Sequence, residues 1–188
     1  MITALTVSDR AYDRCYHGIK TVVHAPGGIR DAAQAQAARF DAIAKVDTSH
    51  FFFLDDDDDL PPGYEAVLER ALAVGKPLVY TDEMVRSAEE GEHVWFRGDY
   101  SQAAHLRDRM LVHHLALCDT GAARAAIARL PRGHFWPEMM LYWEMAKAGA
   151  AHLPEVCYLW NRRPTGLHTL PAIIMAQTRA AIWCRDNP

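Results

Sequence analysis

Residues 51–64, FFFLDDDDDLPPGY, place an apolar run, five consecutive aspartates and a Pro-Pro-Gly break in immediate succession. The apolar run from His50 to Leu54 is typical of a strand that is buried on both faces within a parallel sheet. Beyond the break, apolar residues recur at three- and four-residue spacing from Tyr64 to Leu72, which predicts a helix that Gly75 can end. The segment therefore predicts a buried strand, an acidic loop and a helix, in that order.

Similar patterns predict alternating strands and helices on both sides of this segment. Short β-branched runs predict strands, and apolar residues at helical spacing predict helices. The predicted strands are Ile2–Val7, Lys20–His24, Pro77–Val85, Glu92–Phe96, Leu111–Cys118 and His152–Trp160, and the predicted helices are Arg30–Val46, Ala122–Leu130, Glu138–Lys147 and Pro171–Cys184. This alternation predicts an α/β fold with a mixed, mainly parallel sheet and helices on both of its faces.

The length and composition fit a single globular domain spanning residues 1–188. The chain is 50% hydrophobic and 23% charged, which is enough for a sizeable core, and its net charge of -4 argues against a uniformly basic nucleic-acid binder. No run of about 18 apolar residues is present that could span a membrane. The four cysteines form no CxxC pair, so neither a zinc site nor a disulfide framework is indicated. We therefore expect a cytoplasmic protein.

The five adjacent carboxylates repel one another, so something must offset their charge. A solvated loop is one explanation. The run follows a buried strand, however, at the edge where open α/β sheets bind their ligands. Carboxylate oxygens suit Mg²⁺ or Mn²⁺, and these ions commonly bridge protein carboxylates and substrate phosphates. We favour a site that binds a diphosphate through a divalent cation.

Residues 51–64 also resemble the segment FLDsDDxLpPGyL of family 2 glycosyltransferases, which have the Rossmann-like GT-A fold. The resemblance implies that Asp55 and Asp57 form the DxD pair that holds Mn²⁺ or Mg²⁺, with Asp55 also close to the nucleotide. It further implies that Asp58 orients the donor sugar. Asp56 and Asp59 are expected to be solvated.

Further segments extend this resemblance over residues 30–168. Arg39 lies where the family has an arginine that contacts the base or phosphates of the donor, although Phe40 replaces the family's asparagine. Residues 137–149, PEMMLYWEMAKAG, resemble the helix that carries the family's catalytic aspartate, and Glu138 occupies that position. A glutamate can also take a proton from an acceptor hydroxyl. The alternative role of Glu138 is to complement the dipole at the helix N-terminus.

Residues 153–163, LPEVCYLWNRR, resemble a late strand of the family, which implies that Arg163 binds the diphosphate. His168 would then be a further metal ligand, as a late histidine is in some GT-A enzymes. The pair His113-His114 is predicted within a strand, where adjacent side chains point to opposite faces, so we expect it to chelate poorly.

One segment departs from the family. The family binds the nucleobase with an acidic DDGSxD loop after its second strand, whereas this chain has residues 24–28, HAPGG. Glycines permit a close approach of the backbone to a ligand. We therefore expect a nucleobase pocket with altered recognition.

The resemblance implies an inverting, metal-dependent transfer of a sugar from a nucleoside diphosphate, with a UDP-sugar as the first choice, to a hydroxyl group. Two alternatives stay open: a haloacid-dehalogenase-like phosphatase, and a GT-A fold that binds sugar or cation without catalysis. The acceptor is open between a saccharide, a lipid-linked glycan, a protein and a modified nucleic acid such as DNA. Six arginines are candidates for a polyanion groove, although scattered surface positions also explain them: Arg97, Arg107, Arg109, Arg124, Arg129 and Arg132.

Overall fold

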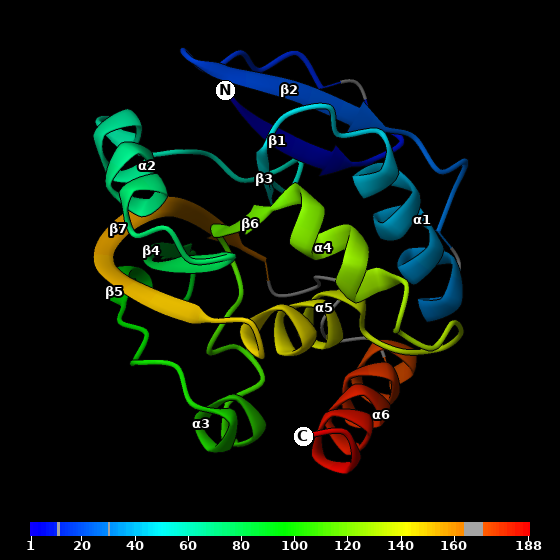
Figure 1. The fold of residues 1–188 in the computed structure, drawn as a ribbon. Helices are drawn as coiled ribbons and strands as arrows, with labels where there is room; N and C mark the ends of the chain where they lie inside the picture. Colours follow the sequence, from blue (N-terminus) through cyan, green and yellow to red (C-terminus); the bar gives the residue numbers. More distant parts are fainter. Residues whose placement is uncertain (11, 30, 164–170) are drawn as a thin grey trace.

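The computed structural model describes residues 1–10, 12–29, 31–163 and 171–188, and in these residues a sheet of seven strands is surrounded by six helices (Figure 1). The strands are β1 (Ile2–Val7), β2 (Ile19–His24), β3 (His50–Phe53), β4 (Leu78–Ser87), β5 (Gly91–Trp95), β6 (Ala116–Asp119) and β7 (Ala150–Arg162). The helices are α1 (Ala32–Ala44), α2 (Tyr64–Ala73), α3 (Gln102–Arg107), α4 (Thr120–Ile127), α5 (Pro137–Ala146) and α6 (Pro171–Asp186).

The strand order is β2-β1-β3-β6-β4-β5, and β7 pairs with the other edge of β4. The pairs β1–β2, β1–β3 and β4–β7 are parallel. Strand β6 is antiparallel to both β3 and β4, and β5 is antiparallel to β4. Because β6 reverses the direction on each of its sides, β1, β2, β3, β4 and β7 all run the same way. The predicted mixed, mainly parallel sheet is confirmed.

Apolar side chains of alternating strand residues fill a core on each face of the sheet. On one face, Leu5, Phe51 and Tyr80 belong to a buried cluster that includes residues of α1, α4, α5 and α6. On the other face, Phe52 and Leu54 belong to a cluster with the apolar stripe of α2. Figure 1 accordingly shows α2 on the opposite side of the molecule from α1 and α6. The prediction of helices on both faces is confirmed.

The prediction of a strand over Leu111–Cys118 is wrong for residues 111–115. Strand β6 begins only at Ala116, and the five residues before it form an irregular segment. Leu115 has a φ of 40°, in the left-handed region that a bulky side chain avoids, and its side chain is fully buried. Burial of this apolar residue offsets the backbone strain, and β6 begins directly after it. Helix α3 was not predicted, because its six residues are too few for a periodic pattern.

Among the described residues, no helix combines the length and the apolarity that a bilayer crossing requires.

Candidate functional site

A cavity of about 560 Å³, a volume typical of small-molecule sites, opens at the edge of the sheet where β1, β3 and β7 end and β6 begins. Residues from all of these strands or the loops beside them line it, together with residues of α1. The polar and charged lining residues include Arg10, Arg39, Asp55, Asp56, Asp57, Asp58, His113, His114, Asn161 and Arg163. This is the edge at which the sequence predicts a ligand.

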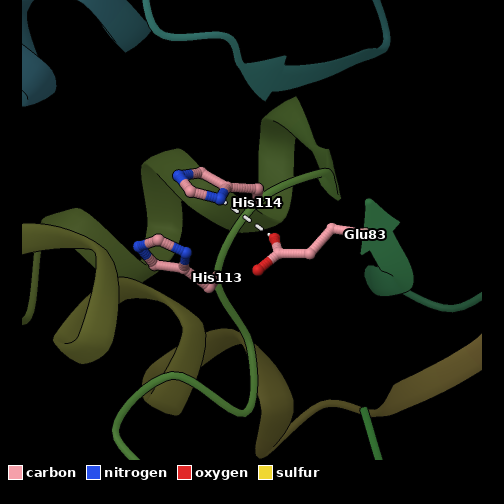
Figure 2. A group of neighbouring side chains, drawn as sticks. All are labelled: Glu83, His113 and His114. Atoms are coloured by element: carbon pink, nitrogen blue, oxygen red, sulfur yellow. Dashed lines mark hydrogen bonds and ion pairs between the residues drawn. The ribbon is translucent and has the colours of Figure 1, made fainter. Parts of the chain in front are cut away.

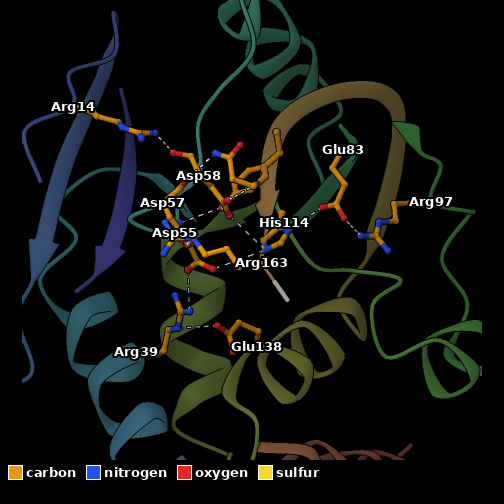
Figure 3. A network of polar contacts seen from close by, with 12 residues as sticks. Arg14, Arg39, Asp55, Asp57, Asp58, Glu83, Arg97, His114, Glu138 and Arg163 are labelled. Carbon is orange, nitrogen blue, oxygen red and sulfur yellow. Dashed lines mark hydrogen bonds and ion pairs between the residues drawn. The ribbon is translucent and has the colours of Figure 1, made fainter. Parts of the chain in front are cut away.

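Strand β7 holds the acidic loop in place (Figure 3). Asp59 and Leu159 exchange two backbone hydrogen bonds, of 3.2 and 2.9 Å. The carboxylate of Asp58 is almost fully buried and accepts hydrogen bonds from the Tyr158 hydroxyl at 2.9 Å and from the Asn161 backbone N–H at 2.7 Å. Burial raises the pKa of Asp58 to about 7, although His114 opposes this shift. Asp58 therefore has a fixed orientation within the loop.

The expectation that Asp56 and Asp59 are solvated is met only in part, since their side chains are 20% and 43% exposed but both have partners within the chain. Asp56 accepts a hydrogen bond from the Ser8 hydroxyl at 2.5 Å, and Asp59 accepts one from the Tyr16 hydroxyl at 2.8 Å. Arg14 also forms an ion pair with Asp59 at 3.3 Å. All three partners come from the segment between β1 and β2. These two aspartates thus attach that segment to the acidic loop.

Arg39 of α1 lies between two carboxylates of the site (Figure 3). Its Nη2 atom lies 3.2 Å from Oδ1 of Asp55, and its Nε atom lies 2.8 Å from Oε1 of Glu138. The guanidinium group also stacks over the ring of Phe53, 4.6 Å from its centroid. Burial alone would raise the pKa of Asp55, but Arg39 and then His114 lower it below its ordinary value. Asp55 is therefore ionised and points into the cavity.

Glu138 lies in the first turn of α5, where the family resemblance expects the catalytic base. Burial raises the pKa of its carboxyl group, while Arg39 opposes the shift. Its second oxygen, Oε2, is buried and has no hydrogen-bond partner among the described residues. The neighbouring residues Trp136 and Pro137 line the cavity, as does its partner Arg39, whereas Glu138 is not among the lining residues. Direct contact between Glu138 and an acceptor therefore stays a prediction.

The arrangement of His113 and His114 differs from the prediction, because both residues precede β6 instead of alternating within it. Their rings lie side by side, with centroids 3.6 Å apart (Figure 2). The Nδ1 atom of His114 lies 2.9 Å from Oε2 of Glu83, a buried residue of β4. Burial lowers the pKa of His114, but Glu83, Asp55 and Asp58 together outweigh burial and raise it.

Sequence reasoning missed His114 and Glu83 as site residues. The adjacent histidines were a visible signal, but the strand prediction assigned them to opposite faces. Glu83 gave no signal of its own, since a single glutamate in a strand is common on exposed faces. Only the pairing of β4 beside β6 brings Glu83 to His114.

Arg163 follows β7 and lies at the cavity, where its Nε atom is 3.2 Å from Oδ2 of Asp57. Asp57 thus shares its charge with an arginine, and its backbone carbonyl accepts a hydrogen bond from the Asn161 side chain at 2.6 Å. His168, the third predicted metal ligand, lies outside the described residues.

Asp55, Asp58 and His114 offer the donor set of a divalent cation. Each supplies one ligand atom, and the three atoms lie within 4.8 Å of one another. Two carboxylate oxygens and an imidazole nitrogen are ligands that Mn²⁺ and related ions accept. The residues present therefore fit the metal that the resemblance implies, although Asp57 is outside this cluster and is paired with Arg163 instead.

The segment that replaces the family's nucleobase loop is already bonded within the chain. The backbone N–H groups of Gly27 and Gly28 both donate to the carboxylate of Asp9, at 2.8 Å in the case of Gly27. Both glycines have a positive φ, 77° and 91°, which this arrangement needs. A nucleobase can reach these N–H groups only if Asp9 moves away.

Most of the six arginines considered for a polyanion groove have partners within the chain, and Arg129, for example, forms an ion pair with Glu144. Arg97 is buried and forms an ion pair with Glu83. Arg124 donates hydrogen bonds to the carbonyl groups of Ile43, Ala44 and Val46 at the end of α1. A groove that uses all six arginines is therefore excluded.

No family model and no curated protein matches the chain. Solved structures of TarS from S. aureus do match. The structure of TarS residues 1–349 with UDP-GlcNAc is 9% identical, with a TM-score of 0.54 over 79% of this chain and 43% of that one. The complex with UDP is 9% identical, with a TM-score of 0.51 over 78% of this chain and 44% of that one. A further TarS structure is 11% identical, with a TM-score of 0.52 over 78% of this chain and 27% of that one.

This likeness shows a shared fold, and the predicted Rossmann-like GT-A architecture is confirmed by it. The chain spans less than half of the length of each TarS structure that it matches.

Proposed function

We propose that this chain is a metal-dependent, inverting glycosyltransferase of the family 2 type, which moves a sugar from a nucleoside diphosphate to a hydroxyl group. The observation that carries the proposal is the cavity at the strand ends, where four aspartates of the acidic loop meet three arginines. The likeness to TarS, which was crystallised with UDP-GlcNAc and with UDP, makes UDP-sugars the first donors to test. The acceptor class, saccharide or modified nucleic acid, stays open.

The cavity contains groups for both parts of such a donor. Arg163 carries a planar guanidinium that can bind a diphosphate through paired hydrogen bonds. A Mn²⁺ or Mg²⁺ ion held by Asp55 and its neighbours would neutralise the charge that develops on the leaving diphosphate. Asp58, fixed by Tyr158 and Asn161, can orient the sugar or the ion.

Glu138 is proposed as the base that takes the proton from the acceptor hydroxyl. Its raised pKa makes the ionised carboxylate a stronger base than an exposed glutamate. Its Oε2 atom has no hydrogen-bond partner among the described residues, while Oε1 is held by Arg39. A single attacking hydroxyl on the face opposite the diphosphate gives inversion at the anomeric carbon.

A second candidate function is binding of a nucleotide-sugar without transfer. The observation that favours it is that Glu138 is not among the residues that line the cavity and is paired with Arg39. In that case the cavity binds the donor, and the buried carboxylate only balances the charge of Arg39.

Donor binding and turnover separate these candidates. Isothermal titration with UDP and UDP-sugars, with and without Mn²⁺, is expected to show binding that the metal strengthens. Donor hydrolysis with water as acceptor is expected to release UDP and a sugar whose initial anomer, followed by NMR, is inverted. Glu138→Gln should lower turnover by about 10²- to 10⁴-fold and leave donor affinity nearly unchanged.

The control is Glu69→Gln, which removes an exposed carboxylate from α2 on the far face of the sheet. Binding without hydrolysis in the unaltered protein would support the second candidate. Release of phosphate from p-nitrophenyl phosphate, with no affinity for UDP, would replace both candidates with the phosphatase alternative.

A further inference from the structure

His114 stands next to the acidic loop without being part of any motif in the sequence. The geometry points to His114 as the nitrogen ligand that completes a divalent-cation site with Asp55 and Asp58, and that makes this site select Mn²⁺ over Mg²⁺. The inference rests on the proposed function, because it names the ligands and the ion of the same site. It also gives Asp58 the place that the resemblance assigns to Asp57.

The distances suit a shared ion. The Nε2 atom of His114 lies 3.9 Å from Oδ2 of Asp55 and 4.0 Å from Oδ2 of Asp58, which is too far for hydrogen bonds. Ligands bind an ion of the size of Mg²⁺ at about 2.0–2.1 Å, so two ligands of one ion lie at most about 4.2 Å apart. The His114 side chain is only 10% exposed, and its Nε2 atom faces both carboxylates.

The contacts of His114 fix its ring in this orientation. Its plane is stacked on Tyr158, 3° from parallel with centroids 4.5 Å apart, and the Tyr158 hydroxyl donates to Asp58. On its other nitrogen, Nδ1 is paired with Glu83 at 2.9 Å. Histidines that bind metals usually donate the second ring N–H to a carboxylate, which leaves the lone pair of the first nitrogen for the metal. Glu83 is therefore a positioning residue for His114.

Glu83 is not itself a ligand, although Glu83, His113 and His114 also lie close enough together to hold an ion (Figure 2). Oε1 of Glu83 is paired with the positively charged Arg97 and Oε2 with His114, whereas the Asp58 oxygens accept hydrogen bonds from uncharged donors and keep lone pairs for an ion. Both side chains of the Glu83–Arg97 pair are buried, and a cation there would have to displace that pair. The Asp55 and Asp58 oxygens that face His114 lie at the cavity, where a diphosphate can add further ligands (Figure 3).

The nitrogen ligand has a consequence for the choice of ion. Mg²⁺ binds oxygen ligands and keeps several waters, whereas first-row transition-metal ions, to which Mn²⁺ belongs, bind at mixed nitrogen and oxygen sites. A site of two carboxylates and one imidazole should therefore bind Mn²⁺ more tightly than Mg²⁺.

Mn²⁺ titration followed by electron paramagnetic resonance tests the inference without any assay of activity. His114→Phe keeps the ring that stacks on Tyr158 and removes the ligand atom, and we expect at least about a tenfold weaker Mn²⁺ affinity. His113→Phe is the matched control, and its Mn²⁺ affinity should equal that of the unaltered protein. Pulsed resonance should show ¹⁴N coupling from imidazole in the unaltered protein and in His113→Phe, but not in His114→Phe.

Two further variants sharpen the test. His114→Asp offers only oxygen, so the preference for Mn²⁺ over Mg²⁺ should fall at least about tenfold. Glu83→Gln keeps the ligand but loosens its orientation, so Mn²⁺ affinity should fall while the ¹⁴N coupling persists. Circular dichroism confirms that each variant is folded.

The outcomes distinguish this inference from the proposed function. Equal Mn²⁺ affinity in His114→Phe and the unaltered protein, or absence of ¹⁴N coupling, would overturn the role of His114 and leave metal-dependent transfer intact. Donor binding without any Mn²⁺ binding would overturn both the cation site and the metal dependence. If His113→Phe weakened Mn²⁺ binding as much as His114→Phe, the assignment of the nitrogen ligand to His114 alone would be wrong.

Discussion

The guanidinium group of Arg39 joins three elements of the molecule through Asp55, Glu138 and Phe53. Its side chain is 16% exposed and that of Glu138 is 11% exposed, so their ion pair lies mostly away from water. Removal of one partner from such a pair leaves a buried charge without compensation. The stability of this corner of the fold therefore depends on both partners being present.

We predict that Arg39→Met lowers the free energy of unfolding by about 3–5 kcal/mol, because Glu138 is left buried and unpaired. Glu138→Gln in the Arg39→Met background should restore part of this loss, since the neutral amide needs no counter-charge. Urea denaturation of the two single variants and the double variant measures the coupling, which we expect at about 1–3 kcal/mol. Additive effects would show that Arg39 and Glu138 do not interact.

The sequence resemblance singled out Arg39, Asp55, Glu138 and Arg163, which the structure brings together at one edge of the sheet, but it could not supply their pairing. Which carboxylate Arg39 contacts depends on how α1 packs against α5, and residues 39 and 138 are far apart in the chain. Asp58, and not the expected Asp57, belongs to the cluster with Asp55 and His114 for a similar reason. It follows from the Tyr158 hydroxyl and Asn161 of β7, which draw Asp58 inward.

At the level of elements, the turn between the acidic loop and α2 depends on one glycine. Gly63 precedes the helix with a φ of 84°, in the left-handed region, and a Cβ atom added there would meet no heavy atom within 4 Å. Any cost of a side chain at this position is therefore backbone strain and not a clash. The Pro-Pro-Gly break predicted the turn, and the structure shows why glycine is its last residue.

We predict that Gly63→Ala lowers the free energy of unfolding by about 1–2 kcal/mol, the cost of placing an L residue in the left-handed conformation. The matched control is Gly98→Ala, since Gly98 does not have a positive φ and also has open space around its Cα. That substitution should be neutral or stabilising by up to about 1 kcal/mol. Thermal or urea unfolding of both variants is the measurement. Equal effects at the two positions would contradict the assignment of strain to Gly63.

Local pattern predicted most elements because each long strand and helix repeats its apolar residues with a clear period. The strand prediction was wrong for residues 111–115 because Leu115 is buried in a left-handed backbone conformation. The apolar pattern of the sequence gives no sign of such a conformation. That single error concealed the site role of His114. Tertiary packing, not local preference, determines the chain direction at this point.

For the whole molecule, the mainly parallel character of the sheet could be predicted from the sequence, but the order of its strands could not. Alternation of strands and helices predicted a mainly parallel sheet, whereas the insertion of β6 between β3 and β4 comes from pairings between residues far apart in the chain. This insertion brings Glu83 and His114 beside the acidic loop. The edge of the sheet at which the cavity lies was therefore predictable from the sequence, whereas the presence of Glu83 and His114 there was not.

The pH dependence of global stability provides a further test of the packing, through His105 of α3. Its ring is fully buried between Tyr100 and Trp143, with centroids 5.7 Å from each. Neither ring nitrogen has a hydrogen-bond partner among the described residues. Burial lowers the pKa of His105 to about 4, although Asp108 opposes this shift. The folded protein therefore keeps this histidine neutral.

Because the unfolded chain has a histidine pKa near 6.5, it binds a proton between about pH 6.5 and 4 that the folded protein does not bind. The contribution of His105 to stability is thus complete above about pH 6.5 and is lost as the pH falls towards 4. His105→Phe keeps an aromatic ring and removes the titration. Between pH 7 and pH 5, we expect the unaltered protein to lose about 2 kcal/mol more of its free energy of unfolding than His105→Phe.

Urea denaturation of both proteins at the two pH values measures this difference. Burial of Asp58, whose pKa is raised to about 7, has the opposite effect on stability, but it is present in both proteins and cancels in the comparison. Equal pH dependence of the two proteins would mean that the His105 ring reaches water, and that α3 does not pack on α5 as the contact with Trp143 requires.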